Sequence, residues 1–213
     1  MNASPTLKRS DYEDYLVYLC FGAGPYDLLK CINGAYSDFS RTLHGLGKLA
    51  PEDKESLRKQ AGSELMQRFS NLKGDLASTT NEAAFDEWHE ATYQQLSTIY
   101  SKHGHHLYVG QAQKWINMTF KYLFTLSKLG KCRHSGFGKV YPFCHAPLDR
   151  SLIDRLNKEY NIPWPNQCTW SRLDNYNHYL CYQQQIRRRF TLVPLDMEFK
   201  LWLGKDVDTV DAT

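Results

Sequence analysis

Lys114 and Asp149 are the two residues of this sequence whose type and placement first suggest a reactive site. Lys114 stands near the start of the amphipathic segment GQAQKWINMTFKYLF (110–124), and Asp149 stands two residues after Pro147 in HAPLDRSLIDRL (145–156). A carboxylate at a helix N-terminus is favoured in its ionised form and can stabilise a nearby positive charge. An amine that has lost its proton can attack an electrophilic carbon. Both residue types can therefore do chemistry in a reactive site.

These residues must be positioned by helices, because apolar side chains recur at helical intervals along most of the chain. The predicted fold class is all-α. The expected helices cover about 11–20, 26–43, 51–72, 82–102, the stretch around Lys114, the stretch after Asp149, 170–190 and the segment MEFKLWL. A short Gly-containing turn, KHGHHLYVGQ, separates the helix over 82–102 from the helix with Lys114. Strand signals are limited to KVYPF and FTLVPL.

The composition fits a folded globule of one domain or two small lobes, with 213 residues, 42% apolar and 14% aromatic. No apolar run reaches the roughly 20 residues of a membrane span, and the N-terminus lacks the apolar core of a signal peptide. We therefore expect a cytoplasmic protein with no membrane contact and with its six cysteines reduced. The net charge of +3 permits a nucleic-acid partner without requiring one.

The order of the elements around the two residues resembles the helix-hairpin-helix DNA glycosylase superfamily. LYVGQAQK, which ends in Lys114, matches the hairpin and the start of its second helix, and APLDRSLIDRL, centred on Asp149, matches the next element. The resemblance covers roughly residues 82–160. It implies a two-lobed helical fold with an interlobe cleft, in which residues 1–81 joined by 161–213 form one lobe and residues 82–160 form the other.

In function, the resemblance implies an enzyme that excises a base, expected to be a modified one, from double-stranded DNA and leaves an abasic site. Asp149 would stabilise the cationic sugar. Lys114 would attack C1′ and form a Schiff base, which is the version we expect; alternatively it contacts DNA and a water attacks. The implied enzyme needs no cofactor and no metal, and we expect a monomer. Repair and defence against phage DNA with modified bases both remain open, as does the identity of the base.

A base that is flipped out of the duplex needs a stacking pocket, and the contacts to DNA need donors and cations. The candidate pocket residues are Trp88, Trp115, Tyr122 and Trp164. The candidate DNA contacts are Gly110, Gln111, Gln113, His105, Arg133, Lys139, Arg150, Arg187 and Arg188.

Three alternative interpretations stay open. Arg172 and His178 have the Arg-x5-His spacing of HEPN ribonucleases, in which they would stabilise the scissile phosphate and move a proton. A non-catalytic helical module that binds nucleic acid would use Lys114 and Asp149 for structure alone. A third constellation, in the loop before Asp149, carries thiol and imidazole groups that can bind zinc. Its members are Cys132, His134, Cys144 and His145.

Overall fold

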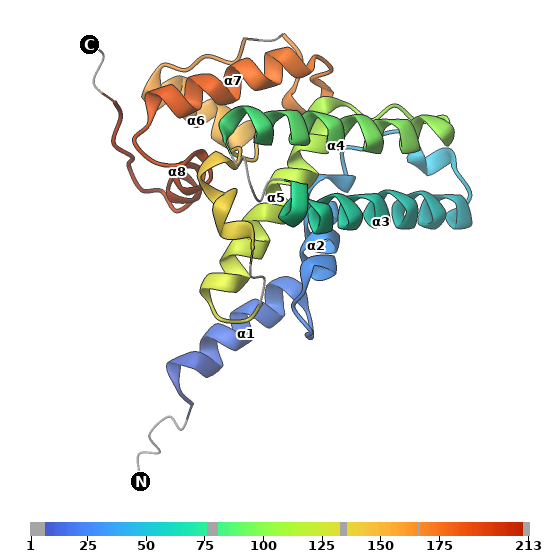
Figure 1. Cartoon of the computed structure of the whole chain (residues 1–213), viewed down its shortest axis with the longest axis horizontal. Coiled ribbons are helices and arrows are strands. Elements are labelled where there is room, and N and C mark those ends of the chain that lie inside the picture. The colour runs from blue at the N-terminus through green and yellow to red at the C-terminus, as the bar shows by residue number, and fades with distance from the viewer. Residues whose placement is uncertain (1–6, 76–80, 133–135, 166, 211–213) are drawn as a thin grey trace.

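The computed structural model describes residues 7–75, 81–132, 136–165 and 167–210. The helices of this part are α1 (Arg9–Phe21), α2 (Leu28–Ser40), α3 (Pro51–Asp75), α4 (Glu82–Lys102), α5 (Val109–Lys128), α6 (Arg150–Tyr160), α7 (Tyr176–Arg189) and α8 (Pro194–Trp202) (Figure 1). Within the same ranges there is no β-strand, so the all-α class is confirmed. No helix in these ranges is long and apolar enough to cross a lipid bilayer.

The two segments with strand signals form other structures. KVYPF runs through two short 3₁₀ turns, η2 (Phe137–Lys139) and η3 (Tyr141–Phe143). FTLVPL contributes only an isolated bridge between Phe190 and Thr209 before α8 begins. A lone bridge has no neighbouring pairs to form a sheet, so neither segment is a strand.

Side-chain caps set where several helices begin. Asn81 caps α4 by accepting a hydrogen bond from the backbone N–H of Ala84, and Asn175 caps α7 in the same way. The expected helix over 170–190 is wrong at its start, because the helix begins only after its cap at Asn175. Residues Trp170–Arg172 form a separate 3₁₀ turn, η4, and α7 begins only at Tyr176.

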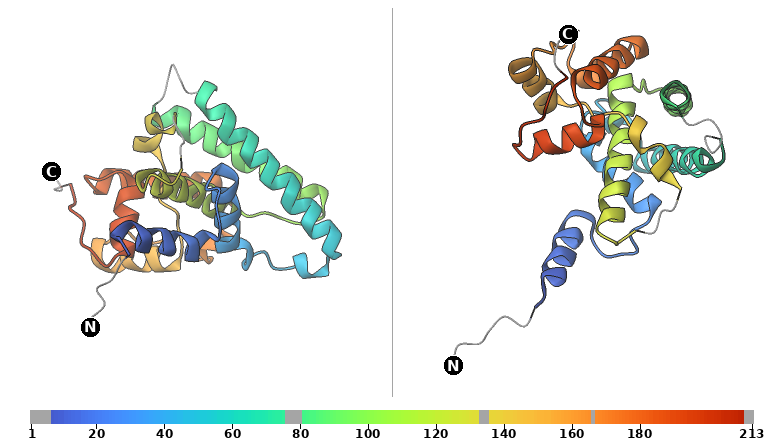
Figure 2. Two further views of the ribbon diagram at one scale, coloured as in Figure 1. Left: turned by 90° about the horizontal axis from the view of Figure 1, so that it is seen from below. Right: turned by 60° about the vertical axis from the view of Figure 1, so that its left-hand side comes forward.

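Helix α5 runs through the middle of the molecule, with the other long helices around it (Figures 1 and 2). Every residue from Val109 to Phe120 is buried, including the polar residues Gln111, Gln113, Lys114, Asn117 and Thr119. When a helix is buried on all sides, the polar side chains it carries must find their hydrogen-bond partners within the protein. The polar residues of α5 therefore mark the places where the interior contains hydrogen bonds and ion pairs as well as apolar contacts.

Two hydrophobic clusters divide the interior. The first contains buried residues between Val17 and Cys144, together with Leu195. The second contains buried residues between Ala146 and Val207, together with Val109 at the start of α5. The N-terminal helices thus share a core with α4 and α5. The chain passes from one cluster to the other just before Asp149.

Gly110 allows the close contact between α5 and η4. A Cβ atom at this position would lie 1.7 Å from the carbonyl oxygen of Trp170. The Gly110 N–H donates to the carbonyl of Leu173 at 3.0 Å. Only glycine fits a backbone contact this close, so the start of α5 is fixed against the segment that leads into α7.

Candidate functional site

The structure brings Lys114 and Asp149 together. Lys114 Nζ donates to Asp149 Oδ2 at 2.8 Å, with side chains only 7% and 15% exposed. The other carboxylate oxygen accepts from the backbone N–H of Leu152 at 3.0 Å and so caps α6. Each oxygen of the Asp149 carboxylate therefore has its own hydrogen-bond donor.

A second ion pair lies next to the first and was not anticipated from the sequence. Lys121, two turns after Lys114 on the same face of α5, donates to Glu198 Oε2 of α8 at 2.7 Å. The Glu198 side chain is fully buried, and its Oε1 atom has no protein hydrogen-bond partner. Burial raises the pKa of Glu198, while the charges of Lys121 and Lys114 oppose this shift. We refer to Lys114, Lys121, Asp149 and Glu198 as the charge cluster.

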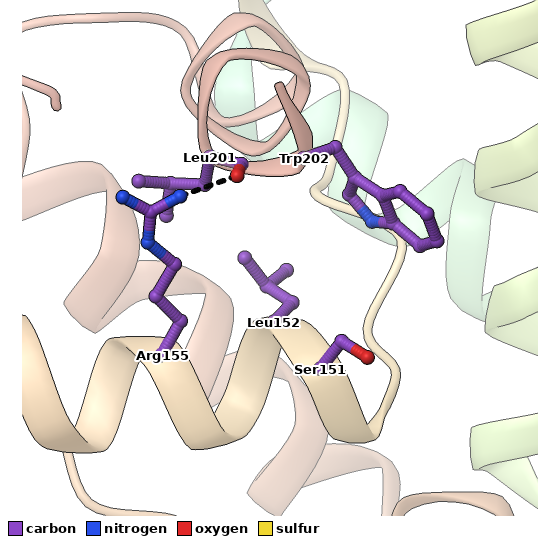
Figure 3. A pocket seen from close by; sticks show the side chains of 5 residues that line it. All are labelled: Ser151, Leu152, Arg155, Leu201 and Trp202. Carbon is purple, nitrogen blue, oxygen red and sulfur yellow. Dashed lines mark hydrogen bonds between the residues drawn. The ribbon is translucent and has the colours of Figure 1, made fainter. Parts of the chain in front are cut away.

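A small cavity of about 130 Å³ opens beside the charge cluster, between the start of α6 and the end of α8. Its walls are Ser151, Leu152, Arg155, Leu201 and Trp202 (Figure 3). Figure 3 shows the Trp202 indole on one side of the opening and the Arg155 guanidinium on the other, bonded to the Leu201 carbonyl. The indole is more than half exposed, so its face is accessible at this edge.

Aromatic rings and a larger cavity extend the site along α8. Lys121 Nζ lies 5.2 Å from the centroid of the Phe199 ring and 5.4 Å from that of Trp202, so cation–π contacts link the rings to the charge cluster. Lys121 and Phe199 also line a cavity of about 470 Å³ between α5 and α8. Its other walls are Phe124, Thr125, Lys128, Leu129, Tyr141, Leu195 and Asp196. This cavity is mainly apolar with a cationic edge, which suits a planar ring next to an anionic group.

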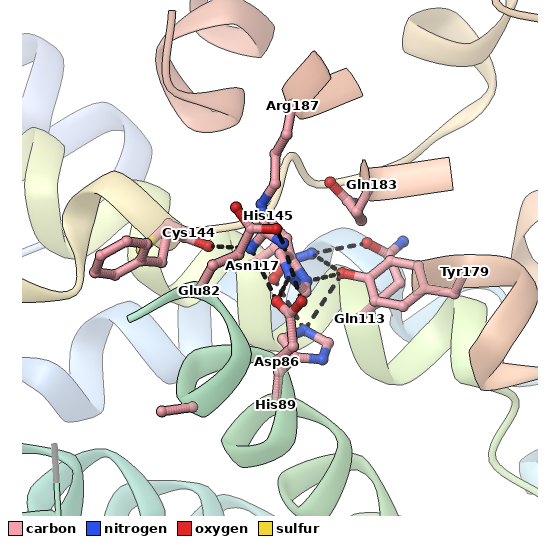
Figure 4. Close-up of polar contacts among 12 residues, drawn as sticks. Glu82, Asp86, His89, Gln113, Asn117, Cys144, His145, Tyr179, Gln183 and Arg187 are labelled. Carbon is pink, nitrogen blue, oxygen red and sulfur yellow. Dashed lines mark hydrogen bonds and ion pairs between the residues drawn. The ribbon is translucent and has the colours of Figure 1, made fainter. Parts of the chain in front are cut away.

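A network of buried polar side chains joins α4, α5 and α7 to the loop before Asp149 (Figure 4). At its centre, His145 Nε2 lies 2.8 Å from Asp86 Oδ1, and His145 Nδ1 lies 2.7 Å from the Tyr179 hydroxyl. The Arg187 guanidinium donates two hydrogen bonds to the Asp86 carboxylate, at 2.9 and 3.0 Å. Burial alone would raise the pKa of Asp86, but the bonds from His145 and Arg187 outweigh it and lower that pKa to about 2.

The two histidines of this network are neutral. Burial lowers the pKa of His145 to about 4, although the contact with Asp86 opposes the shift. Burial and the neighbouring His145 hold the pKa of His89 well below its ordinary value. His89 lies 2.9 Å from the Tyr176 hydroxyl and 3.1 Å from Asn117 Oδ1, so both ring nitrogens have partners.

The network fixes the backbone that leads to Asp149. Gln183 bonds both the N–H and the carbonyl of Ala146, at 3.1 and 2.7 Å. Gln113 bonds both backbone groups of Leu148, at 3.1 and 2.9 Å. The carboxylate of Asp149 is therefore held by side chains that lie far from it in the sequence. Because both imidazoles are fully buried, we assign the network a positioning role.

The expected base-pocket residues are distributed between the two hydrophobic clusters. Trp88 and Trp115 are buried in the first hydrophobic cluster, where Trp115 Nε1 donates to the carbonyl of Ile32. Tyr122 donates to Asp38 at 2.6 Å, and Trp164 packs against the second cluster. The aromatic side chains beside the charge cluster are Phe199 and Trp202.

Three of the expected DNA contacts lie inside the protein. Gly110, Gln111 and Gln113 are buried and hydrogen-bonded within the chain, so they offer no donors to a duplex. Arg187, expected to contact DNA, is mostly buried and paired with Asp86 and Glu82. Of the remaining candidates, Arg150, Arg188 and Lys139 are exposed, His105 is half-buried, and Arg133 lies outside the described residues.

The residues of the other interpretations are also placed. Arg172 lies in η4 and His178 in the first turn of α7, both exposed, so they do not share one helix. In the loop with zinc-binding residue types, His134 lies outside the described residues, Cys144 Sγ contacts the carbonyl of Val140, and His145 belongs to the network. The described ranges contain no group of three potential metal ligands.

Comparison of the chain with models of protein families, with curated protein sequences and with solved structures finds no match. The site must therefore be interpreted from its own geometry. Sequence reasoning missed Glu198 because a carboxylate in a short amphipathic helix has the composition of an exposed residue. The spacing of Lys114 and Lys121 by seven positions was the one signal of a shared face.

Proposed function

We propose that this protein is a DNA glycosylase that excises a base and leaves an abasic site. The observation that carries the proposal is the contact between Lys114 and Asp149 at the starts of two consecutive long helices. The sequence pattern indicated these two residues by their chemical types, and it contains no information about the distance between their side chains. Glycosidic cleavage needs a carboxylate beside a developing cation, and Asp149 is such a carboxylate.

The state of Lys114 favours water as the attacking group. An attacking amine needs a free nitrogen, whereas Lys114 Nζ is engaged in an ion pair with Asp149 Oδ2 at 2.8 Å. We therefore depart from the covalent mechanism expected from the resemblance. In our proposal Lys114 positions Asp149 and balances its charge until the substrate enters, and Asp149 then stabilises the cationic sugar and orients the water.

Glu198 is suited to deliver the proton that the departing base requires. Burial raises the pKa of Glu198, and its Oε1 atom has no protein partner. Two carboxyl groups in different environments can divide the roles of acid and charge stabiliser. The C1′–N bond breaks, its electron pair and the Glu198 proton go to the base, and water adds to C1′. The proton lost by that water restores Glu198, so the reaction consumes one water and releases one base.

The finer architecture belongs to the same proposal. Helices α4 and α5, with residues 103–108 between them, would form the helix-hairpin-helix element. The exposed Arg150, Arg188 and Lys139 would contact phosphates. A flipped base would stack on Trp202 or Phe199 beside the charge cluster, which requires these partly exposed rings to move and open a path to Asp149.

The test is to incubate purified protein with DNA from several sources, including phage DNA with modified bases. Released bases are measured by mass spectrometry, and abasic sites are measured by their reaction with an aldehyde probe. We expect release from at least one modified DNA, and the source of that DNA distinguishes repair from defence. If the protein binds the DNA but releases no base from any source, the proposed function is wrong and a non-catalytic binding module is supported.

A further inference from the structure

Helix α1 leaves a stripe of large side chains without cover. Tyr12, Tyr15, Leu16 and Leu19 are 50%, 58%, 60% and 59% exposed. Their spacing of three, four and seven positions places them on one face of the helix. Val17, the buried residue of α1, lies on the opposite face. The stripe therefore faces away from the rest of the chain, and it contains no charged residue.

The position of α1 makes this stripe accessible. Figures 1 and 2 show α1 at one end of the molecule, extending away from the other helices toward the N-terminus. Its contacts lie near its C-terminal end, where the Phe21 ring packs 4.9 Å from that of Tyr122, and along one side, where Asp14 pairs with Lys131. A helix of 13 residues is marginally stable in water without tertiary packing. An additional packing partner would stabilise it.

We propose that the partner is a second copy of this chain, whose α1 packs antiparallel against this one. A two-fold axis between residues 15 and 16 places Tyr12 opposite Leu19 of the partner subunit, and Tyr15 opposite Leu16 of the partner subunit. The same contacts repeat on the other side of the axis, so the stripe is complementary to itself, as a symmetric interface requires. Apolar residues at this spacing are those that pack in paired helices.

The exposed area fits a dimer of low affinity. A half-exposed tyrosine or leucine offers on the order of 100 Å². With Tyr18, which is also exposed and lies one turn from Tyr15, each chain contributes roughly 500 Å², or roughly 1,000 Å² for the pair. This is the size of a weak, transient interface. The dimer should therefore dissociate on dilution, which departs from the monomer expected from the sequence.

The mass in solution tests the proposal. Light scattering and sedimentation velocity are measured from about 1 µM to about 1 mM protein. We expect the wild-type mass to approach twice that of one chain as concentration rises. Leu16→Lys should remain monomeric, because it places two charges at the centre of the interface. Leu203→Lys is the matched control, since Leu203 is 58% exposed at the end of α8, and it should dimerise like the wild type.

Cysteine cross-linking tests the orientation. In a Cys20→Ser background, Tyr12→Cys combined with Leu19→Cys should give a covalent dimer, because these positions lie roughly 10 Å apart within one helix and cannot bridge internally. Tyr12→Cys alone should give none. A wild-type protein that stays monomeric throughout, or a Leu16→Lys variant that still dimerises, overturns the proposal. Cross-linking by Tyr12→Cys alone overturns the antiparallel arrangement.

Discussion

Lys114 Nζ and Asp149 Oδ2 are 2.8 Å apart, although 35 positions separate the two residues in the sequence. The contact joins the first turns of α5 to the cap of α6, and the charge cluster surrounds it with a second amine and a second carboxylate. The predictions on catalysis concern the residues of this cluster.

The first prediction concerns Asp149→Asn. Asparagine is also a good helix cap, so α6 should begin at the same residue. Loss of the charge opposite Lys114 should lower the free energy of unfolding by about 3 kcal/mol. Excision should fall by roughly 10³-fold, because the developing cation loses its anionic partner. Single-turnover rates of base release and urea unfolding measure the two effects. Asp154→Asn is the control, and an Asp149→Asn enzyme of normal rate would remove the residue from the mechanism.

The second prediction concerns the amine of Lys114. Because Lys114 Nζ is engaged by the carboxylate of Asp149, borohydride added during the reaction should trap no covalent protein–DNA adduct. Lys114→Gln should lower DNA affinity and the excision rate together, since Asp149 loses its partner. A trapped adduct that disappears in Lys114→Gln would restore the covalent mechanism and make Lys114 the nucleophile.

The third prediction concerns Glu198. Its raised pKa favours the protonated acid, which is lost as pH rises through that pKa. The excision rate should therefore fall on the alkaline side of its optimum. Glu198→Gln should lower the rate by roughly 10²-fold or more and remove this alkaline dependence. Rates measured across pH with both proteins give the answer. If the variant keeps the wild-type pH profile, Glu198 has only a structural role.

The fourth prediction concerns stability at acidic pH. The folded-state pKa of His145 is about 4, below its ordinary value of 6.5, and that of His89 is also lowered. The unfolded chain therefore binds more protons below pH 6.5, and stability is lost as pH falls from 6.5 toward 4. His145 alone accounts for about 3 kcal/mol of this loss. The pKa of Glu198 is raised, which acts in the opposite direction.

Urea denaturation at pH 7.5, 6.5, 5.5 and 4.5 measures the stability loss, with unfolding followed by tryptophan fluorescence. The pKa of Asp86 is lowered from its ordinary value of 3.8 to about 2, so its contribution to stability is lost mainly as pH falls from 3.8 toward 2, below this range. A free energy of unfolding that stays constant from pH 7.5 to 4.5 would contradict the neutral state assigned to the histidines.

The sequence predicted the positions of the helices better than it predicted which of their side chains are buried and what those side chains contact. The range 82–102 matches α4, and the expectation that Asp149 follows a loop and starts a helix is confirmed by its cap on α6. Local signals, namely apolar periodicity and capping residues, determine such features. They could not show that Arg187 turns inward to Asp86, because that contact joins residues 101 positions apart.

The interior of α5 shows why the candidate site was only partly predicted. Gln111 and Gln113 have the composition of exposed positions, and their burial depends on backbone groups supplied by distant loops. Glu198 is placed by the packing of α8, which no local pattern encodes. Residue chemistry thus identified Lys114 and Asp149, while the groups that accompany them become visible only in three dimensions.

The close backbone contact at Gly110 limits which amino acids can be tolerated at this position. Any missense change at codon 110 adds at least a Cβ atom where the carbonyl oxygen of Trp170 would be only 1.7 Å away. The obstacle is backbone on both sides, so no rotamer change can relieve it. A saturation library selected for folded protein should therefore recover glycine alone at this codon, while Arg150 and Arg188, both exposed, tolerate many replacements.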